Sequence, residues 1–525
     1  MRMTLLRSCY SAIVIISCTG CCIMADTVRE PLDRPNILLF LADDMGYGDL
    51  ESYGHPSQES GPIDQMAREG MKFSRWYSPD VLCSPSRGAM LTGRLPVRVG
   101  LYGPARVFEM STSYGLPKSE TTIAEMLKEQ GYHTGMVGKW HQGINEFSHN
   151  DGNHLPHHHG FDFVGHLIPF TNHWMCDETK IYIDAPDRYY CLLYYNDTII
   201  QQPLSHRNLT ERLVEDAKSF IFDHQDEPFF FYFSFPQVHT DMFSSPKFSG
   251  SSKRGRYGDS LNEMSWAVGE TLSAIKEAGL ERNTLALFLS DHGPQTEVCN
   301  EGGSSGILKG SKDSTWEGGI RVPAIARWPD TIAQGSHSQA IISSMDIFAT
   351  AADLSGGKLP QDRIMDSSSF LPILTGTSAE HRKVLFHYCS DRLMAVTYGV
   401  FKAHFYTKPA MNLEQLATKC RKGWIPTGPY HLCFSCDPPC AVHHEPPLLY
   451  NIGVDPSELS PLNTRKYLDV LSEVERIVEE HQKTLVKGDS LFIRERALWL
   501  NPCCNPPYCM CNYDRTLYLK ELGLS

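Results

Sequence analysis

Four apolar segments of this chain are each followed by acidic, histidine or lysine residues, and no other feature constrains the fold as strongly. Runs of this length and composition predict buried strands of a parallel sheet. The segments with the residues that follow them are Asn36–Leu41 with Asp43 and Asp44, His133–Val137 with Lys139 and His141, Pro228–Phe235 with His239, and Thr284–Ser290 with Asp291 and His292. Because ligands of open α/β sheets bind outside the carboxyl ends of the strands, we expect these side chains to converge if the strands are neighbours.

The first of these strand ends has the composition of a metal site. Asp43 and Asp44 are paired carboxylates, and such hard oxygen ligands suit Ca²⁺ or Mg²⁺. Two solvated loop acids are the ordinary alternative for an isolated Asp-Asp pair. The preceding strand and the nearby Gly46 and Gly48 favour the metal.

A second stretch, Cys83-Ser-Pro-Ser-Arg87, combines a thiol with the start of a helix. Pro85 suits the first turn of a helix, and Ser84 and Ser86 are good capping residues. Cys83 is therefore expected just ahead of a helix N-terminus, where a thiolate is stabilised. The donors of Arg87, one turn further on, suit a tetrahedral oxyanion. A half-buried cysteine at a helix start, or one half of a disulfide, is the alternative interpretation.

Cys-x-Pro-Ser-Arg, followed by Leu-Thr-Gly-Arg at 91–94, resembles the signature of type I sulfatases. Other segments are similar to the same family. They are Gly-Lys-Trp-His at 138–141, His-Gly-Phe-Asp at 159–162 and Lys-Gly-Ser-Lys-Asp-Ser-Thr-Trp-Glu-Gly-Gly-Ile-Arg-Val-Pro at 309–323. The chain departs from the family pattern at Gln142, where Leu is usual, and at His292, where Asn or Gln is usual. The resemblance covers nearly the whole chain and is nearest the steryl-sulfatase subgroup, without that subgroup's hydrophobic hairpin.

The resemblance implies that Cys83 is oxidised to Cα-formylglycine by the formylglycine-generating enzyme and that its hydrate is the nucleophile. The metal ligands it implies are Asp43, Asp44, Asp291, His292 and one oxygen of the modified Cys83. The sulfate-binding residues it implies are Lys139, His239, Lys312 and, lining the site, Thr171.

The catalytic roles also follow from the resemblance. Asp291 acts as the base during attack on sulfur, and Arg87 orients the modified side chain. His239 and Lys312 assist departure of the alcohol or phenol. His141 then takes a proton from the second hydroxyl, so that sulfate leaves.

The family fold implied is α/β and alkaline-phosphatase-like, with a large mixed sheet sandwiched by helices and a smaller C-terminal domain built on an antiparallel sheet. We expect a signal peptide at 1–25, a catalytic domain at 34–380 and a Cys-rich domain at 381–525. Two alternating strands are expected early in the last domain, Val384–Tyr388 and Leu393–Phe405.

The N-terminus and the cysteines indicate the secretory pathway. Basic Arg2 and Arg7 precede an apolar stretch that ends near Ala25, and sequons begin at Asn196 and Asn208. Of 17 cysteines, four lie in the predicted signal, and setting Cys83 aside leaves an even 12. Disulfides are therefore expected, with a zinc site at Cys433, Cys436 and Cys440 as the alternative. No mature segment is apolar enough to span a membrane, which predicts a soluble protein, secreted or resident in the lysosome or endoplasmic-reticulum lumen.

The net charge of -13 argues against a nucleic-acid partner. The substrate expected is a small-molecule or glycan sulfate ester, and the sequence indicates no oligomeric state. Two other functions stay open, a related phosphate or phosphonate ester hydrolase and a catalytically silent secreted binding protein on the same scaffold.

Overall fold

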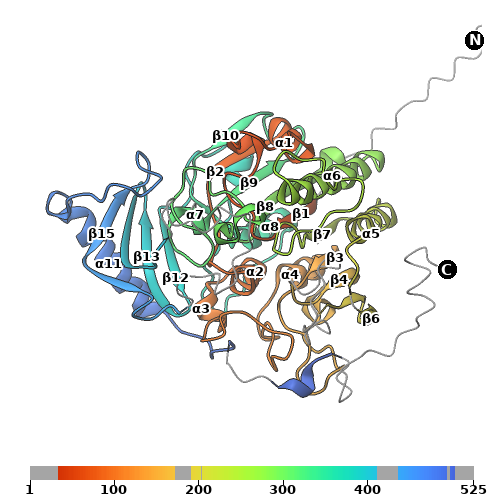
Figure 1. Cartoon of the computed structure of the whole chain (residues 1–525), viewed down its shortest axis with the longest axis horizontal. Coiled ribbons are helices and arrows are strands. Elements are labelled where there is room, and N and C mark those ends of the chain that lie inside the picture. The colour runs from red at the N-terminus through yellow and green to blue at the C-terminus, as the bar shows by residue number, and fades with distance from the viewer. Residues whose placement is uncertain (1–33, 172–190, 203, 411–434, 493–496, 503–525) are drawn as a thin grey trace, which may run out of the picture. The chain divides into compact units, whose positions relative to one another are not determined.

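The structure is a computed structural model that describes residues 34–171, 191–202, 204–410, 435–492 and 497–502. Two β-sheets organise this part of the chain (Figure 1). The predicted signal peptide lies outside these residues. The larger sheet has 11 strands in the order β10-β2-β9-β8-β1-β7-β3-β4-β5-β6, with β11 pairing to β2. The smaller has four, in the order β12-β13-β14-β15.

The strands of the large sheet are β1 (Asn36–Ala42), β2 (Met71–Tyr77), β3 (His133–Lys139), β4 (Phe163–Ile168), β5 (Leu193–Tyr195), β6 (Thr198–Gln201), β7 (Phe229–Ser234), β8 (Thr284–Ser290), β9 (Arg321–Arg327), β10 (Ser336–Ser338) and β11 (Ile342–Ser343). Those of the small sheet are β12 (Val384–Cys389), β13 (Arg392–Tyr398), β14 (Phe401–Thr407) and β15 (Val442–Asn451). The longer helices are α1 (Pro62–Glu69), α2 (Cys83–Thr92), α4 (Ile123–Glu129), α5 (Leu209–Asp223), α6 (Arg256–Glu277), α8 (Asp346–Ser355) and α11 (Leu468–Thr484). Single-turn helices are α3 (Pro96–Val99), α7 (Glu317–Ile320) and α9 (Leu371–Leu374).

Strand β1 shows why the large sheet is covered on both faces. All seven of its residues are buried, and successive side chains point to opposite faces of a sheet. Leu39 and Leu41 pack in a core that includes residues of α2, α4 and α8. Leu38 and Phe40 pack in a second core with residues of α1, α5 and α6. The large sheet is therefore sandwiched by helices.

The predicted fold class is confirmed. Strands β8, β1, β7, β3 and β4 are mutually parallel, whereas β9 pairs antiparallel with both β8 and β2, so the large sheet is mixed. The small sheet is antiparallel throughout, and Leu471 and Val474 of α11 pack on it. The expected single strand Leu393–Phe405 is in fact two, because Gly399, at φ 59°, forms a turn between β13 and β14.

Apart from Cys83, the cysteines in the described residues form disulfides rather than a zinc site. Cys389 at the end of β12 is bonded to Cys436, and Cys440 is also in a disulfide, so two of the three proposed zinc ligands are unavailable. Cys433 lies outside the described residues. None of the described helices is both long enough and apolar enough to cross a bilayer.

Candidate active site

The four strand ends singled out in the sequence meet at one edge of the large sheet. Their strands are adjacent in the order β8-β1-β7-β3 and run parallel, so their carboxyl ends lie together. Asp43 and Asp44 follow β1, Asp291 and His292 follow β8, and Lys139 is the last residue of β3. All five side chains are buried.

Helix α2 brings Cys83 to this edge. Cys83 is the first residue of the helix after the N-cap Leu82, so it lies one position further in than expected. Ser84 and Ser86 do not cap the helix. Instead the Ser86 hydroxyl donates to the carbonyl of Asp80 at 2.8 Å, and the Ser84 hydroxyl accepts from a backbone N–H at 3.2 Å.

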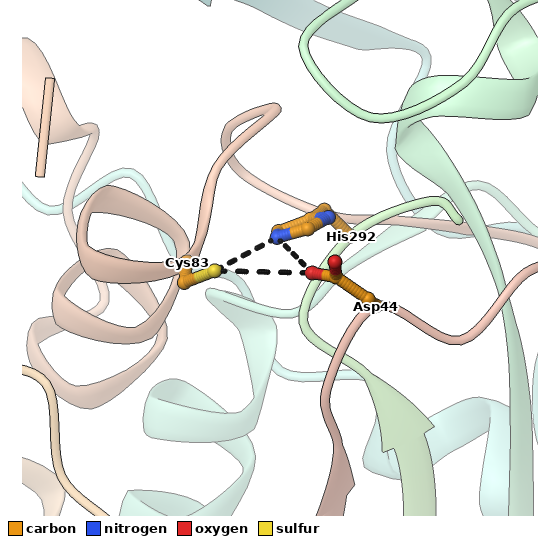
Figure 2. Close-up of side chains that lie close together, drawn as sticks. All are labelled: Asp44, Cys83 and His292. Atoms are coloured by element: carbon orange, nitrogen blue, oxygen red, sulfur yellow. Dashed lines mark hydrogen bonds and ion pairs between the residues drawn. The ribbon is translucent and has the colours of Figure 1, made fainter. Parts of the chain in front are cut away.

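The Cys83 thiol lies among ligand-type atoms, as Figure 2 shows. Its Sγ is 3.2 Å from His292 Nε2 and 3.9 Å from Asp44 Oδ1, and these two atoms are 3.2 Å apart. Cys83 is buried and is the free cysteine among the described residues. The alternative that it forms half of a disulfide is therefore wrong.

Arg87 uses its guanidinium to hold two carboxylates in place. Nε and Nη2 lie 3.0 and 2.9 Å from Asp291 Oδ2, and Nη2 is also 3.1 Å from Asp43 Oδ1. Nη1 donates to the hydroxyl of Ser234 at 2.6 Å. The arginine therefore joins the ends of β1, β7 and β8. Its predicted contacts with an oxyanion and with the modified side chain stay predictions.

Each aspartate after β1 is paired with a lysine. Lys139 Nζ is 2.6 and 2.8 Å from the two oxygens of Asp43, and Lys312 Nζ is 2.7 and 2.8 Å from those of Asp44. Burial raises the pKa of Asp43, but Lys139 together with Arg87 and His239 outweighs burial, so the pKa is lowered. Burial likewise raises the pKa of Asp44, and Lys312 with His239 brings it down to about 2. Both carboxylates are therefore ionised and available as ligands.

His292 and His141 differ in their protonation states. Burial lowers the pKa of His292, but Asp291, Cys83 and Asp44 raise it to about 10. The protonated, positively charged form of the ring is therefore favoured when no metal ion is bound. The Nδ1 atom of His292 donates to the carbonyl of Gly293 at 2.9 Å, which directs Nε2 at Cys83.

Burial lowers the pKa of His141 well below its usual value, with Lys139 adding to the effect. Its Nε2 lies 3.0 Å from the carbonyl of Phe108, which can only accept, so the neutral ring carries its proton there. Nδ1 is then the basic nitrogen, and it has no hydrogen-bond partner in the described part of the chain.

Two predicted residues lie further out. His239 Nε2 is 3.8 Å from Asp44 Oδ2, and burial lowers the pKa of His239 to about 4. The hydroxyl of Thr171 is buried and has no partner among the described residues. Two residues before Thr171, the carbonyl of Pro169 accepts the backbone N–H of His141 at 3.1 Å.

The residues present fit a hard divalent cation. One set of ligand atoms comprises Asp44, Cys83 and His292, and another comprises Asp43, Cys83 and Asp291, each with its atoms within 4.8 Å of one another. Cys83 is common to both sets. Three ionised carboxylates beside one thiol form an oxygen-rich donor set, which suits Ca²⁺ or Mg²⁺.

The site contains two residues that the sequence argument did not assign to it. Ser234 orients Arg87, and the signal was a polar residue that ends an otherwise aromatic strand. Gln142, where the family usually has Leu, donates its amide to the carbonyls of Ser84 at 2.8 Å and His141 at 2.9 Å. It thereby ties the helix of Cys83 to the loop of His141.

Comparison with known proteins agrees with this geometry. A family model described as sulfatase matches residues 35–357, and one described as the C-terminal region of aryl-sulfatase matches residues 380–511. The chain is 50% identical over 486 residues to an arylsulfatase of Hemicentrotus pulcherrimus, covering 92% of this chain and 88% of that protein. It is 36% identical over 569 residues to the steryl-sulfatase of Homo sapiens, covering 93% and 96%. The solved PsFucS1 sulfatase from Pseudoalteromonas sp. is similar in fold, with a TM-score of 0.73 at 24% identity over 87% of this chain and 92% of that one.

Proposed function

Because this chain belongs to the sulfatase family and is a sulfatase enzyme, we propose that it cleaves a sulfate monoester through Cys83 oxidised to Cα-formylglycine, beside a divalent cation. The observation that carries the proposal is the position of Cys83. Its Sγ lies within 3.9 Å of both Asp44 and His292, at the centre of the converging strand ends. A side chain placed there can act on a substrate and share a metal ion at the same time.

Two groups that must be added to the chain supply part of the chemistry. Formylglycine supplies an aldehyde hydrate, a nucleophile with two hydroxyls, and we propose that the formylglycine-generating enzyme makes it from Cys83. A bound Ca²⁺ or Mg²⁺ makes such a hydroxyl more acidic and balances negative charge on the sulfate. Asp43, Asp44, Asp291 and Nε2 of neutral His292 would hold the cation, together with an oxygen of the modified Cys83; the cation would replace the proton that the raised pKa of His292 favours without it.

The cationic side chains bind the sulfate group. Lys139 forms an ion pair with Asp43 and Lys312 forms one with Asp44, so the two ammonium groups approach the site from separate elements. With His239 they would surround the nonbridging oxygens, where negative charge develops during transfer. Lys312 and His239 would also assist the departing oxygen.

Asp291 and His141 accept the protons that are released during the reaction. Asp291 Oδ1 accepts the N–H of Asp44 at 3.1 Å and Oδ2 is held by Arg87, so its orientation is fixed. We assign it the proton released when the nucleophile attacks. His141, neutral and with Nδ1 unpartnered in the described residues, is suited to take the second proton as sulfate leaves.

The predicted signal peptide, the sequons and the disulfides support passage through the secretory pathway. We propose that the protein works in an extracellular, lysosomal or other luminal compartment. The relatives are named arylsulfatase and steryl-sulfatase, and we propose a phenol or alcohol sulfate ester as substrate.

Comparing an aryl sulfate with the matching aryl phosphate tests this function. Purified protein from a secretory host is expected to hydrolyse the sulfate with the higher kcat/KM. Faster turnover of the phosphate would favour the phosphate-ester alternative. No turnover of either ester, by protein shown to carry formylglycine, would favour the silent scaffold.

A further inference from the structure

Strand β14 of the small sheet is attached to the segment that carries Lys312. The segment 312–317 runs from the active-site lysine to the first residue of α7. The indole of Trp316 donates to the carbonyl of Lys408, just beyond β14, at 3.1 Å. Lys402, within β14, lies 2.9 Å from Glu317 Oε1. Residues about ninety positions apart in sequence are thus held together beside the site.

Of the residues that attach this segment to the small sheet, Asp313 lies next to Lys312 in the sequence. Its carboxylate is bound on one side by Arg106 and on the other by Lys408, whose Nζ is 2.5 Å from Oδ2. Its backbone has φ 69°, in the left-handed region, and its N–H donates to the carbonyl of Val81 at 3.1 Å. Val81 lies two residues before Cys83. Asp313 therefore connects β14, the approach to Cys83 and Lys312.

The far end of the segment is fixed by a second buried network. Glu317, Lys402, Glu458 and His404 have side chains with no exposed surface. Glu458 accepts the N–H of Glu317 at 2.6 Å and the ring N–H of His404 at 2.6 Å. The hydroxyl of Tyr77 donates to Glu317 at 2.9 Å. Both ends of the Lys312 segment are thus anchored to the small sheet.

We propose that Lys408 and Asp313 are positioning residues for Lys312, so that the small sheet is part of the catalytic apparatus. The inference rests on the proposed function, in which Lys312 assists the leaving group. In this proposal neither residue contacts the substrate. They act by fixing the backbone from which Lys312 extends to Asp44, at 2.7 Å.

Charge balance makes Lys408 the better residue to change. Asp313 has two cationic partners, so Lys408→Met leaves a buried carboxylate still paired with Arg106. Removing Asp313 instead would take the shared carboxylate away from both cations at once, which is costly in a buried site. Lys408→Met is therefore expected to fold, and Lys408→Arg keeps the ion pair.

The test measures kcat and KM for two esters with different leaving groups. Lys408→Met is expected to lower kcat by about 10- to 100-fold and to raise KM by much less, because the contact of Lys312 with the departing oxygen strengthens in the transition state while Lys139 and His239 still bind the sulfate. The loss should be larger for an alkyl sulfate than for a nitrophenyl sulfate, because the alkyl oxygen is the more basic leaving atom. Lys408→Arg should recover most of the rate. The control Lys487→Met, which removes the exposed ion pair with Asp391 at 2.9 Å, should leave both esters unaffected.

A double variant separates positioning from general loss of structure. If Lys408 acts through Lys312, adding Lys408→Met to Lys312→Ala should lower kcat no further. Losses that multiply, or that are equal for the two esters, overturn the inference while leaving the proposed function intact. A crystal structure of Lys408→Met gives a readout independent of activity. Lys312 displaced from Asp44 supports the inference, and Lys312 unmoved overturns it.

Discussion

At the scale of single residues, the chemistry depends on the contrast between Cys83 and its charged surroundings. Asp43, Asp44 and Asp291 are buried and ionised because Lys139, Lys312 and Arg87 face them. Such a set is costly to bury unless every charge is paired. Here each carboxylate has a cationic partner, and each has one oxygen within 4.8 Å of the Cys83 Sγ.

Replacing Cys83 tests the two-hydroxyl nucleophile. A serine offers one hydroxyl, so Cys83→Ser is expected to accept a sulfuryl group and then stop. Intact mass spectrometry after incubation with nitrophenyl sulfate should show one covalent sulfate per chain and no further turnover. Cys83→Ala, with no nucleophile, should remain unlabelled. Turnover by Cys83→Ser at the rate of the unchanged protein would rule out this mechanism.

Much of the site could be predicted at this scale, because strand ends and short motifs are local signals. Arg87 was identified, but its partners were not, since Asp43 and Asp291 reach it only through the sheet order β8-β1-β7. His141 was identified from its motif, whereas its neutral state follows from burial. Sequence reasoning finds residue types and misses the contacts that set their protonation.

At the scale of elements, the end of β3 must approach β7 closely to present Lys139. Gly138 has φ 89°, and a Cβ on it would lie 1.8 Å from the carbonyl oxygen of Ser234. The same serine orients Arg87 through its hydroxyl. A larger residue at 138 would therefore disturb both the lysine and the arginine.

Gly138→Ala and Gly279→Ala form a matched pair. Gly279, after α6, also has a positive φ of 73°, but its Cβ would meet nothing within 4 Å. Gly279→Ala should cost about 1 kcal/mol from backbone conformation alone. Gly138→Ala should cost about 3–5 kcal/mol, because overlap with the backbone of β7 is added. Thermal unfolding measures both, and equal melting temperatures would show that the close approach of β3 to β7 is not needed.

Strands β1, β3, β7 and β8 could be predicted nearly to their ends, since each is a buried run of ordinary length. The break between β13 and β14 was missed, although Gly399 marks it, because Tyr398 and Val400 continue the apolar pattern on either side. Propensity alone could not reveal that this turn places Lys402 within β14 and Lys408 just beyond it, where they pair with Glu317 and Asp313 of the segment that carries Lys312.

At the scale of the whole molecule, the α/β class and the separate antiparallel sheet were predictable from the succession of strands and from family resemblance. The connection between the two sheets was not. It consists of ion pairs such as Lys402 with Glu317 and Lys408 with Asp313, which leave no periodic trace in the sequence. The predicted division at residues 380 and 381 stays a prediction. The buried pairs across it suggest that the two parts work as one.

Mass spectrometry of the peptide that contains Cys83 shows whether this residue is the precursor of the nucleophile. Protein from a secretory host should yield that peptide with the mass of the aldehyde or its hydrate, and the aldehyde should react with a hydrazide probe. An unmodified thiol at Cys83, in protein that still hydrolyses aryl sulfate, would contradict the account.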